Sequence, residues 1–390
     1  MGKNGRHEYL KAIRLRYRKA GKKEKGNILN EFCQVCGYNR KYAIRILSTS
    51  AKRKARKRPG RKPVYQDSQL LTVLKRIWLA SDQMCSKKLK AALPLWLPFY
   101  EEAYEPITTA LENRLLRMSP ATIDRILRPV RVRVGKKGLG GTKPGSLLKN
   151  QIPIRTHHWD VSRPGFVEAD TVAHCGNSLA GDFAWSLTMT DIETTWTEIR
   201  ATWNKGATGV LAQIQDIEAA LPFPLRGFDC DNGSEFLNHH LVRYFTDHPG
   251  DIQFTRSRPY KKNDNAHVEQ KNWSHVRNLF GYDRLDMPQL VPLMNALYRE
   301  EWSHYQNHFC PSMKLQSKER INSKYRKTYD TPKTPFQRVM RSGHISEQTK
   351  EQLRTVHLSL NPFILKQSIE RKLRAIFKHV KVTSNVRQRL

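Results

Sequence analysis

The chain has 390 residues and a formal net charge of +34, from 69 lysines and arginines against 35 acidic residues. Self-repulsion of this size is relieved when a polyanion binds, so the composition favours a nucleic-acid-binding protein, a class that includes ribosomal and RNA-packaging proteins. The sequence contains neither a run of about 18 apolar residues nor an apolar N-terminal segment, so we expect no membrane span and no signal peptide.

The six cysteines are scattered along the chain and do not describe a secreted disulfide framework. A reducing cytoplasm is therefore the simpler expectation. Cys33 and Cys36 have the spacing of half a zinc site, but no second Cys or His pair follows at finger spacing. Because the two cysteines also fit an apolar helical stripe, we expect them to pack in a core.

The positive charge is concentrated in the first 150 residues, which carry 36 lysines and arginines against 10 acidic residues. Within residues 1–50, an apolar helical pattern, Gly37 and a second helical pattern indicate a helix-turn-helix. In such units the second helix enters the major groove, so we predict DNA contacts from Arg40, Lys41 and Arg45. The alternative is an ordinary helical hairpin whose basic side chains are only solvated.

Residues 51–64 are basic and lack apolar side chains, which predicts a linker that also lies along phosphates or a minor groove through Arg58, Arg61 and Lys62. Residues 65–130 are helical again and form a predicted second DNA-binding domain. Ser119 is the expected N-cap of its last helix, which presents Arg125 to DNA. Residues 131–163 are glycine-rich and aperiodic, so we interpret them as a linker; no Gly-Lys-Ser/Thr ending supports a phosphate loop.

Residues 164–285 alternate strand and helix patterns. The expected strands are 166–171, 183–191, 196–202, a strand ending at Asp231, and 252–255; helices are expected at 208–221, at 234–245 and around Glu269. Three hairpin-linked strands followed by alternating helices predict a mixed α/β sheet. Residues 286–390 are predicted to be a basic, mainly helical accessory region, irregular from Ile321 to Lys333.

Carboxylates follow the apolar runs of this α/β region. Asp231 ends one strand, immediately before an Asn-Gly turn, where ligands meet open α/β sheets. Glu269 begins a helix, and Asp170 lies on an upstream strand. Three carboxylates that meet at one sheet edge repel one another unless a divalent cation joins them. Alternation does not separate Asp170 from Glu168, or Asp231 from Asp229, because residues two apart share a strand face.

Asp-Asn-Gly-x-Glu-Phe at 231–236, followed by Asn-Asp-Asn-Ala-His-Val-Glu-Gln-Lys-Asn at 263–272, resembles the integrase core of DDE transposases, which retroviral integrases share. The resemblance covers roughly 164–285. It implies an RNase H-like catalytic core preceded by tandem all-α helix-turn-helix units, in an insertion-sequence transposase. It also selects Asp170, Asp231 and Glu269 as the catalytic and metal-binding triad. The interval from Asp231 to Glu269 is 38 positions, slightly longer than the familiar one.

The resemblance implies metal-dependent cleavage of DNA at the element ends and 3′-hydroxyl strand transfer into target DNA. Two Mg²⁺ ions, replaceable by Mn²⁺, would be held by the three carboxylates, since hard cations prefer oxygen ligands. The expected partners are double-stranded DNA, as terminal repeats and target, and further copies of the chain in a homo-oligomer on DNA. A bacterial, nucleoid-associated location follows from that activity.

Basic residues near the triad are predicted to hold DNA. Lys261 and Lys262 precede the Glu269 helix and are candidates for phosphate contacts. Many relatives carry a basic residue seven positions after the glutamate, where this chain has Val276, so Lys271 and Arg277 are the candidates here. Glu235 is expected to cap a helix start, favoured there by the helix dipole.

Two other functions remain open from the sequence. A nuclease of the same fold would cut DNA without joining it. Such nucleases rarely need a separate domain that recognises a DNA sequence, so the basic helical N-terminal region argues against this alternative. A DNA-binding regulator with an inactive core would retain DNA binding alone. The three carboxylates at compatible spacing favour the enzyme.

Overall fold

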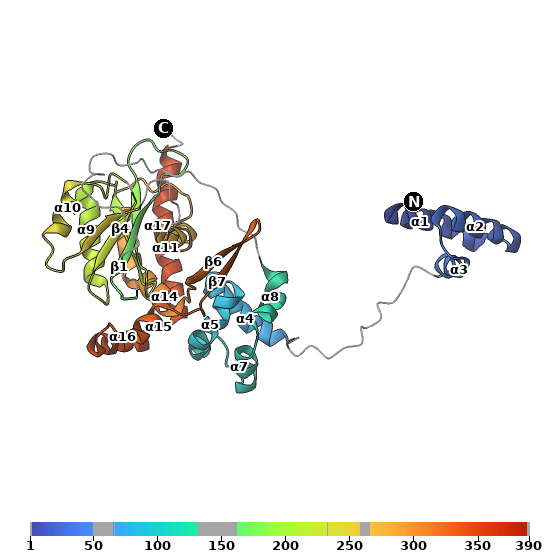
Figure 1. Cartoon of the computed structure of the whole chain (residues 1–390), viewed down its shortest axis with the longest axis horizontal. Coiled ribbons are helices and arrows are strands. Elements are labelled where there is room, and N and C mark those ends of the chain that lie inside the picture. The colour runs from blue at the N-terminus through green and yellow to red at the C-terminus, as the bar shows by residue number, and fades with distance from the viewer. Residues whose placement is uncertain are drawn as a thin grey trace. The chain divides into compact units, whose positions relative to one another are not determined.

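The computed structural model describes residues 2–49, 65, 67–131, 162–231, 233–257 and 266–387, apart from the side chains of Lys3, Ala266, His267, Glu269, Lys324 and 381–387. The chain divides into two compact units, Met1–Val64 and Tyr65–Leu390. Both are drawn in Figure 1. None of the described helices combines the length and the apolar composition that a membrane crossing requires.

The first unit contains three helices, α1 (Lys3–Lys19), α2 (Lys22–Cys36) and α3 (Arg40–Ser48). Gly37 ends α2 in the left-handed conformation, with φ of 67°, and Asn39 caps α3 by accepting from the backbone N–H of Lys41. A left-handed residue at this position is available to glycine at little cost. The expected pair of helices joined by a glycine turn is confirmed, and its core includes Ile28, Phe32 and Leu47.

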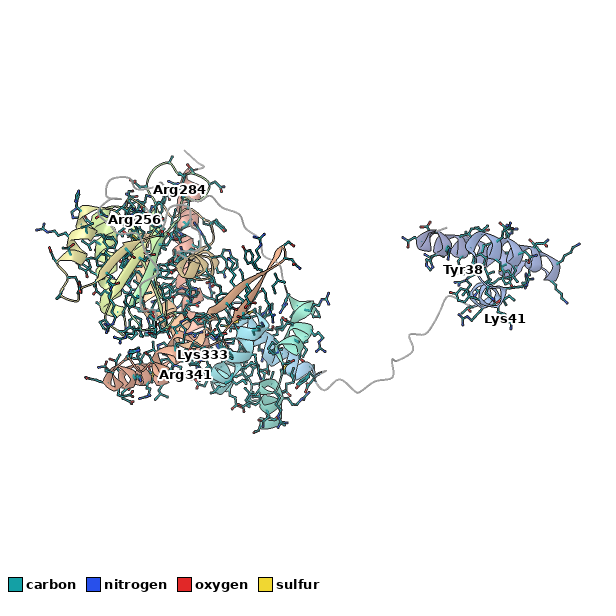
Figure 2. The ribbon with its side chains drawn as sticks, in the orientation of Figure 1. Tyr38, Lys41, Arg256, Arg284, Lys333 and Arg341 are labelled. Atoms are coloured by element: carbon teal, nitrogen blue, oxygen red, sulfur yellow. The ribbon has the colours of Figure 1, made fainter. Side chains whose placement is uncertain are left out.

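Cys36 is buried in this small core, and Cys33 packs against it. Their side chains therefore contribute apolar contacts, as the helical spacing predicted. Tyr38 and Lys41 lie on the same unit (Figure 2).

The second unit begins with short helices: α4 (Ser68–Ala80), α5 (Ser86–Trp96), η1 (Leu97–Phe99), α6 (Tyr100–Ala103), α7 (Thr109–Leu116), α8 (Pro120–Leu127) and η2 (Arg128–Val130). Ser119 caps α8 as predicted. These helices share one hydrophobic cluster with the C-terminal helices of the chain. Trp96 donates from Nε1 to the carbonyl of Phe309 at 3.0 Å, and Tyr305 donates to the carbonyl of Ala80 at 2.7 Å. The 65–130 region is thus anchored to distant parts of the chain.

A five-stranded sheet with the order β3-β2-β1-β4-β5 forms the centre of this unit. Its strands are β1 (Phe166–Ala173), β2 (Ala184–Asp191), β3 (Thr197–Trp203), β4 (Gly227–Cys230) and β5 (Gln253–Arg256). The first three are antiparallel neighbours, whereas β4 and β5 run parallel to β1. The predicted mixed α/β sheet is therefore confirmed.

Helices cover both faces of the sheet (Figure 1). On one face α9 (Ala207–Ala220) and α10 (His239–Thr246) pack against Val167, Ala169 and Phe228. The opposite face carries Val172 and meets the continuous helices α11 (Ala266–Lys271)–η3 (Asn272–Arg277)–α12 (Asn278–Phe280) and α13 (Leu290–Ala296)–η4 (Leu297–Trp302)–α14 (Ser303–Phe309). Strand alternation therefore directs Glu168 and Asp170 toward the second helical layer.

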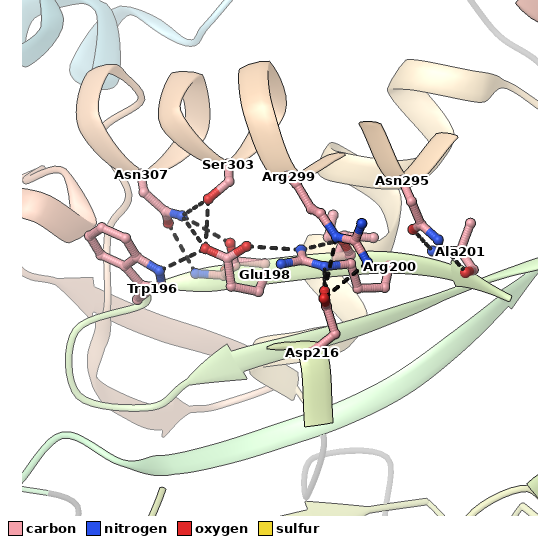
Figure 3. Close-up of polar contacts among 11 residues, drawn as sticks. Trp196, Glu198, Arg200, Ala201, Asp216, Asn295, Arg299, Ser303 and Asn307 are labelled. Carbon is pink, nitrogen blue, oxygen red and sulfur yellow. Dashed lines mark hydrogen bonds and ion pairs between the residues drawn. The ribbon is translucent and has the colours of Figure 1, made fainter. Parts of the chain in front are cut away.

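Side chains of the second layer complete the hydrogen bonds of the edge strand β3 (Figure 3). Asn307 bonds both the N–H and the C=O of Thr197, each at 3.0 Å, and Asn295 does the same for Ala201, at 2.6 and 2.9 Å. The two amides thus replace a neighbouring strand, which protects an edge that otherwise invites pairing with another chain.

The alignment of these amides depends on the π-helical turn η4. Twelve residues of α-helix would leave Asn307 about 120° around the axis from Asn295. A π turn takes in one additional residue, which removes about 100° of this offset. Asn295, Arg299, Ser303 and Asn307 therefore follow one line along the helix and face β3 (Figure 3).

The C-terminal region contains a hairpin, β6 (Leu315–Ile321) and β7 (Lys324–Tyr329), and helices α15 (Pro335–Arg341), α16 (Glu347–Ser359) and α17 (Pro362–Arg387). The expectation of irregular structure from Ile321 to Lys333 is wrong. Ile321 pairs with Lys324 across a two-residue turn in which Asn322 has a φ of 55°. Tyrosines and a threonine after this turn favour a strand.

Candidate active site

Asp170 and Asp231 lie on neighbouring strands. Glu168 pairs with Asp229 and Ala169 with Cys230 in the parallel register of β1 and β4. Asp170 and Asp231 are the residues that directly follow this last pair on their two segments. Paired residues of adjacent strands share a face and lie about 4.8 Å apart, so a register continued by one residue would set the two carboxylates side by side at the carboxyl end of β4.

The turn after β4 holds Asp231 through its backbone. The N–H of Gly233 donates to Oδ1 of Asp231 at 2.9 Å. A Cβ atom at position 233 would lie 2.8 Å from that same oxygen and 2.6 Å from the Glu235 carboxyl carbon. Both distances are shorter than Cβ atoms normally show, so a larger residue at position 233 would have to displace the carboxylate ends of Asp231 and Glu235.

Glu235 is part of this site, and the expectation that it caps a helix is wrong. Asn238 caps α10 by accepting from the N–H of Leu241 at 3.1 Å. The buried Glu235 side chain instead accepts from the hydroxyl of Thr171 at 2.9 Å and pairs with Lys205 at 3.3 Å. The sequence shows a carboxylate two positions after the turn glycine, but the direction in which this side chain points depends on the tertiary fold.

The electrostatics of this turn favour a bound cation. Burial, reinforced by the charge of Glu235, raises the pKa of Asp231 to about 6, whereas the Gly233 N–H and Lys205 act in the opposite direction. A positive charge beside Asp231 would favour its ionised form. Lys205 supplies one such charge, and its ammonium also lies 5.0 Å from the ring centroid of Trp185.

Burial separates the carboxylate pairs that strand alternation left ambiguous. Glu168 is 1% exposed and accepts from the N–H of Val268 at 3.3 Å, near the start of α11. Asp229 is fully buried and accepts from the hydroxyl of Thr255 at 2.6 Å. Asp170 and Asp231 are only partly buried. Glu168 and Asp229 therefore bind protein groups inside the fold, and Asp170 and Asp231 remain accessible.

The helix that carries Glu269 lies alongside β1. Val268 bonds Glu168, and the side-chain amide of Asn272 donates to Oδ2 of Asp170 at 2.7 Å. These contacts fix the α11 backbone, Glu269 included, beside the strand of the first carboxylate. The Glu269 side chain lies outside the described residues.

The π-helical turn η3 changes which residues share the face of Glu269. In an α-helix, Arg277 would lie about 80° around the axis from Glu269, eight residues earlier. Because a π turn takes in one additional residue, this angle falls to about 20°. Trp273 and Arg277 therefore follow Glu269 along one line, while Val276 turns into the core with no exposure. The basic residue on the face of Glu269 is therefore Arg277, eight residues later, whereas Val276, seven residues later, is not on that face.

The contacts of Arg277 are within the fold. It donates to the carbonyl of Ala173 at 2.9 Å, at the end of β1, and its guanidinium lies 4.8 Å from the ring centroid of Tyr282. Burial lowers its pKa. Its predicted contact with DNA stays a prediction.

Lys271 points away from the Glu269 line, because two helical residues turn through about 200°. It is 9% exposed, and burial, followed by the charge of Lys88, lowers its pKa to about 7. Lys271 therefore does not share the face of Glu269, and its predicted contact with DNA stays a prediction.

The remaining DNA-binding candidates belong to other segments of the chain. Arg40, Lys41 and Arg45 are exposed on α3, and Arg125 is exposed on α8. The guanidinium of Arg45 lies 5.0 Å from the ring centroid of Tyr42, itself 40% exposed. Arg58, Arg61, Lys62, Lys261 and Lys262 lie outside the described residues.

The donor set suits a hard divalent cation. Asp170 and Asp231 offer carboxylate oxygens from adjacent strands, with Asn272 and Gly233 N–H groups holding one oxygen of each. Carboxylate oxygens are the ligands that Mg²⁺ and Mn²⁺ prefer. Among the described side chains, which exclude that of Glu269, no three acidic, histidine or cysteine groups form a metal cluster. Two of the three expected ligands thus belong to β1 and to the residue directly after β4, its neighbour in the sheet, and the third is on the helix alongside β1.

A scan against models of known protein families finds no match for this sequence. The catalytic core domain of BIV integrase covers 30% of this chain and 68% of its own, with 15% identity and a TM-score of 0.24. An intasome of simian T-cell lymphotropic virus, in complex with PP2A regulatory subunit B56 gamma, covers 57% of this chain and 68% of its own, with 13% identity and a TM-score of 0.28. TM-scores this low do not establish a shared fold, so the fold of this chain is judged from its own strand order.

The uncharacterized protein y4rM of Sinorhizobium fredii is 38% identical over 337 residues, which cover 85% of this chain and 94% of that protein. The match therefore extends over most of both chains. The chain belongs to the same protein family as y4rM.

Proposed function

We propose that the chain is a DDE-type DNA transposase, a metal-dependent polynucleotidyl transferase that cleaves DNA at the ends of an insertion sequence and joins the freed ends to target DNA. The observation that carries the proposal is the parallel pairing of β1 and β4 up to the residues directly before Asp170 and Asp231, beside the helix of Glu269. The motif around these residues resembles the integrase core, and the geometry supports that resemblance.

The strand order also supports an RNase H-like core. Three antiparallel strands, β1 to β3, extend the sheet on one side, and the parallel strands β4 and β5 extend it on the other. In this arrangement the carboxylates lie at the carboxyl end of β4 and at the centre of the sheet, where two strands and one covering helix meet.

The residues of the chain would hold and orient the reacting groups. Asp170, Asp231 and Glu269 would bind two Mg²⁺ ions, with Asn272 orienting Asp170 and the Gly233 N–H orienting Asp231. When bound, Mg²⁺ supplies activation of the attacking oxygen and charge neutralisation at the scissile phosphate. Phosphoryl transfer needs such positioning and neutralisation more than a nucleophilic side chain.

The proposed reaction has two displacements at phosphorus. Water attacks a phosphodiester at the element end, the new P–O bond replaces the bond to the 3′ oxygen, and a 3′-hydroxyl is freed. That hydroxyl then attacks a target phosphodiester, forming one P–O bond and breaking another. Neither step needs a covalent enzyme intermediate.

The N-terminal helices would recognise DNA. The exposed basic side chains of α3 project from a helix that follows a glycine turn, as in units that insert their second helix into the major groove. Because each site acts on one end, joining two ends would require further copies of the chain on the DNA, as a homo-oligomer.

A strand-transfer assay tests the proposal. The full chain is incubated with Mg²⁺ or Mn²⁺, plasmid target and duplex DNA taken from the flanks of its gene, ending in a free 3′-hydroxyl. We expect joined products, their loss in Asp231→Asn and Asp170→Asn, and unchanged DNA binding by both variants. Metal-dependent cutting without joining would support an RNase H-fold nuclease instead, and DNA binding without either activity would support a regulator.

A further inference from the structure

A basic cleft of about 550 Å³ lies on the far side of the Glu269 helix, between α5, the α11–η3 helix and the β6–β7 hairpin. Its described lining contains five lysines and no acidic residue. They are Lys88 of α5, Lys271 of α11, Lys314 before the hairpin, and Lys318 and Lys327 on the hairpin. Segments distant in the sequence thus bring like charges together, which is unfavourable without an anion.

Lys271 is the central member of this cleft. The residue is 9% exposed, and its ammonium has no hydrogen-bond or ion-pair partner among the described residues. An ammonium group in a largely buried side chain that has no partner loses part of its hydration without compensation. The fold therefore retains a costly group whose cost an anionic ligand in the cleft would offset.

The other lysines of the cleft differ in whether their ammonium groups already have a partner within the protein. Lys314 forms an ion pair with Glu193 at 2.6 Å, and Lys318 lies 4.7 Å from the ring centroid of Tyr325. Lys88 and Lys327 have no ion-pair partner among the described residues. The hydroxyl groups of Thr190, Thr195, Ser274 and Ser312 also line the cleft, and each of them is hydrogen-bonded within the protein. Ammonium donors without carboxylates match a phosphate group.

The cleft shares strands and a helix with the carboxylate site. Thr190 pairs with Glu168 across β1 and β2, and Glu168 is two residues from Asp170. Lys271 is likewise two residues from Glu269, on the opposite side of the same helix. A nucleic-acid strand with one phosphodiester at the carboxylates would therefore lie along the helix that also carries Lys271.

We propose that this cleft binds backbone phosphates of the DNA substrate, with Lys271 and Lys88 as the principal contacts and the basic face of the hairpin closing over the strand. This assignment rests on the proposed DNA transposase activity, since it concerns the same substrate. A two-stranded antiparallel ribbon is a shape that DNA accommodates, and the exposed Lys318 and Lys327 face each other across this one.

The experiment compares the full-length protein with Lys271→Met, Lys88→Met and the control Lys378→Met, an exposed lysine on α17 outside the cleft. Binding of a fluorescent duplex is measured over a range of salt concentrations, and thermal unfolding is measured with and without inorganic pyrophosphate. We expect Lys271→Met to weaken duplex binding about tenfold and to reduce the salt slope by about one. It should raise the melting temperature without ligand and abolish the stabilisation by pyrophosphate.

Each outcome bears on the inference. Lys88→Met should show the binding defects even if Lys271→Met folds poorly, and Lys378→Met should behave like the wild type. An unchanged salt slope in both cleft variants would overturn the DNA assignment. Loss of pyrophosphate stabilisation alone would indicate a site for a free polyphosphate and would also overturn it. If the wild type shows these binding effects but no metal-dependent cleavage, the proposed transposase activity fails while the cleft assignment stands.

Discussion

The side-chain amide of Asn272 donates a hydrogen bond of 2.7 Å to Oδ2 of Asp170, which ties the helix of Glu269 to the strand of the first carboxylate. Thr171 donates from its backbone N–H to the other oxygen of Asp170, also at 2.7 Å. Both oxygens of this carboxylate are therefore oriented, one by its own strand and one by the neighbouring helix.

Asn272→Ala should reduce metal-dependent cleavage or joining about tenfold to a hundredfold, because a partner that orients a ligand carboxylate affects metal affinity and activity on this scale. A higher metal concentration should restore part of the activity. Asn278→Ala, an exposed asparagine on the same helix, is the matched control. Full activity of Asn272→Ala at low metal concentration would show that Asp170 does not depend on this amide.

Gly233→Ala should reduce activity more than a hundredfold and destabilise the fold by about 1–3 kcal/mol, because the added methyl group overpacks the space between Asp231 and Glu235. Cleavage and urea unfolding are the two measurements. Gly343→Ala serves as the control, since a Cβ atom there meets nothing within 4 Å. A normally active Gly233→Ala protein would contradict the crowded turn.

Trp273 should report DNA binding at the carboxylate site. It is 60% exposed and follows Glu269 by one turn on the line that η3 creates. Bases stack on exposed aromatic rings, so bound DNA should quench its fluorescence. Subtracting the signal of Trp273→Phe from that of the wild type isolates this residue among eight tryptophans. Equal quenching in the two proteins would place the DNA elsewhere.

Asn307→Ala should destabilise the second unit by about 2–4 kcal/mol, because it leaves the N–H and C=O of Thr197 buried without partners. The exposed edge of β3 should also increase aggregation. Denaturant unfolding and light scattering measure the two effects. Gln348→Ala, at an exposed position on α16, should change neither. A wild-type stability for Asn307→Ala would mean that the edge finds other partners.

His174 should make the fold sensitive to acid. Burial, followed by the charge of Arg277, lowers its pKa to about 3. In the unfolded chain this histidine takes up a proton near pH 6.5, whereas in the folded chain it stays neutral down to about pH 3. The free energy of unfolding should therefore decrease as the pH falls from about 6.5 toward 3, by about 1.4 kcal/mol per pH unit. Between about pH 6 and about pH 4, the free energy of unfolding of His174→Gln should depend less steeply on pH than that of the wild type, by the equivalent of about one proton. Urea unfolding at several pH values measures this difference. An identical slope would show that His174 titrates normally.

The amino-acid sequence determined much of the local structure. Strand alternation located the runs that became β1 to β5, and Gly37 and Ser119 marked a helix end and a helix start, because these signals act within a few residues. The Asp-Asn-Gly turn and the upstream Asp170 could also be identified from the sequence as candidate site residues, since both are associated with apolar runs.

Only the tertiary structure decided which polar side chains meet. Burial distinguished Asp170 and Asp231 from Glu168 and Asp229, and packing brought Glu235 to Lys205. A π turn, for which the sequence has no simple signal, placed Arg277 on the Glu269 face, and tertiary packing brought Lys271 into a cleft with Lys88. The reason is physical: alternation and helical period fix directions along one element, whereas contacts between elements depend on register, helix winding and burial across the whole fold.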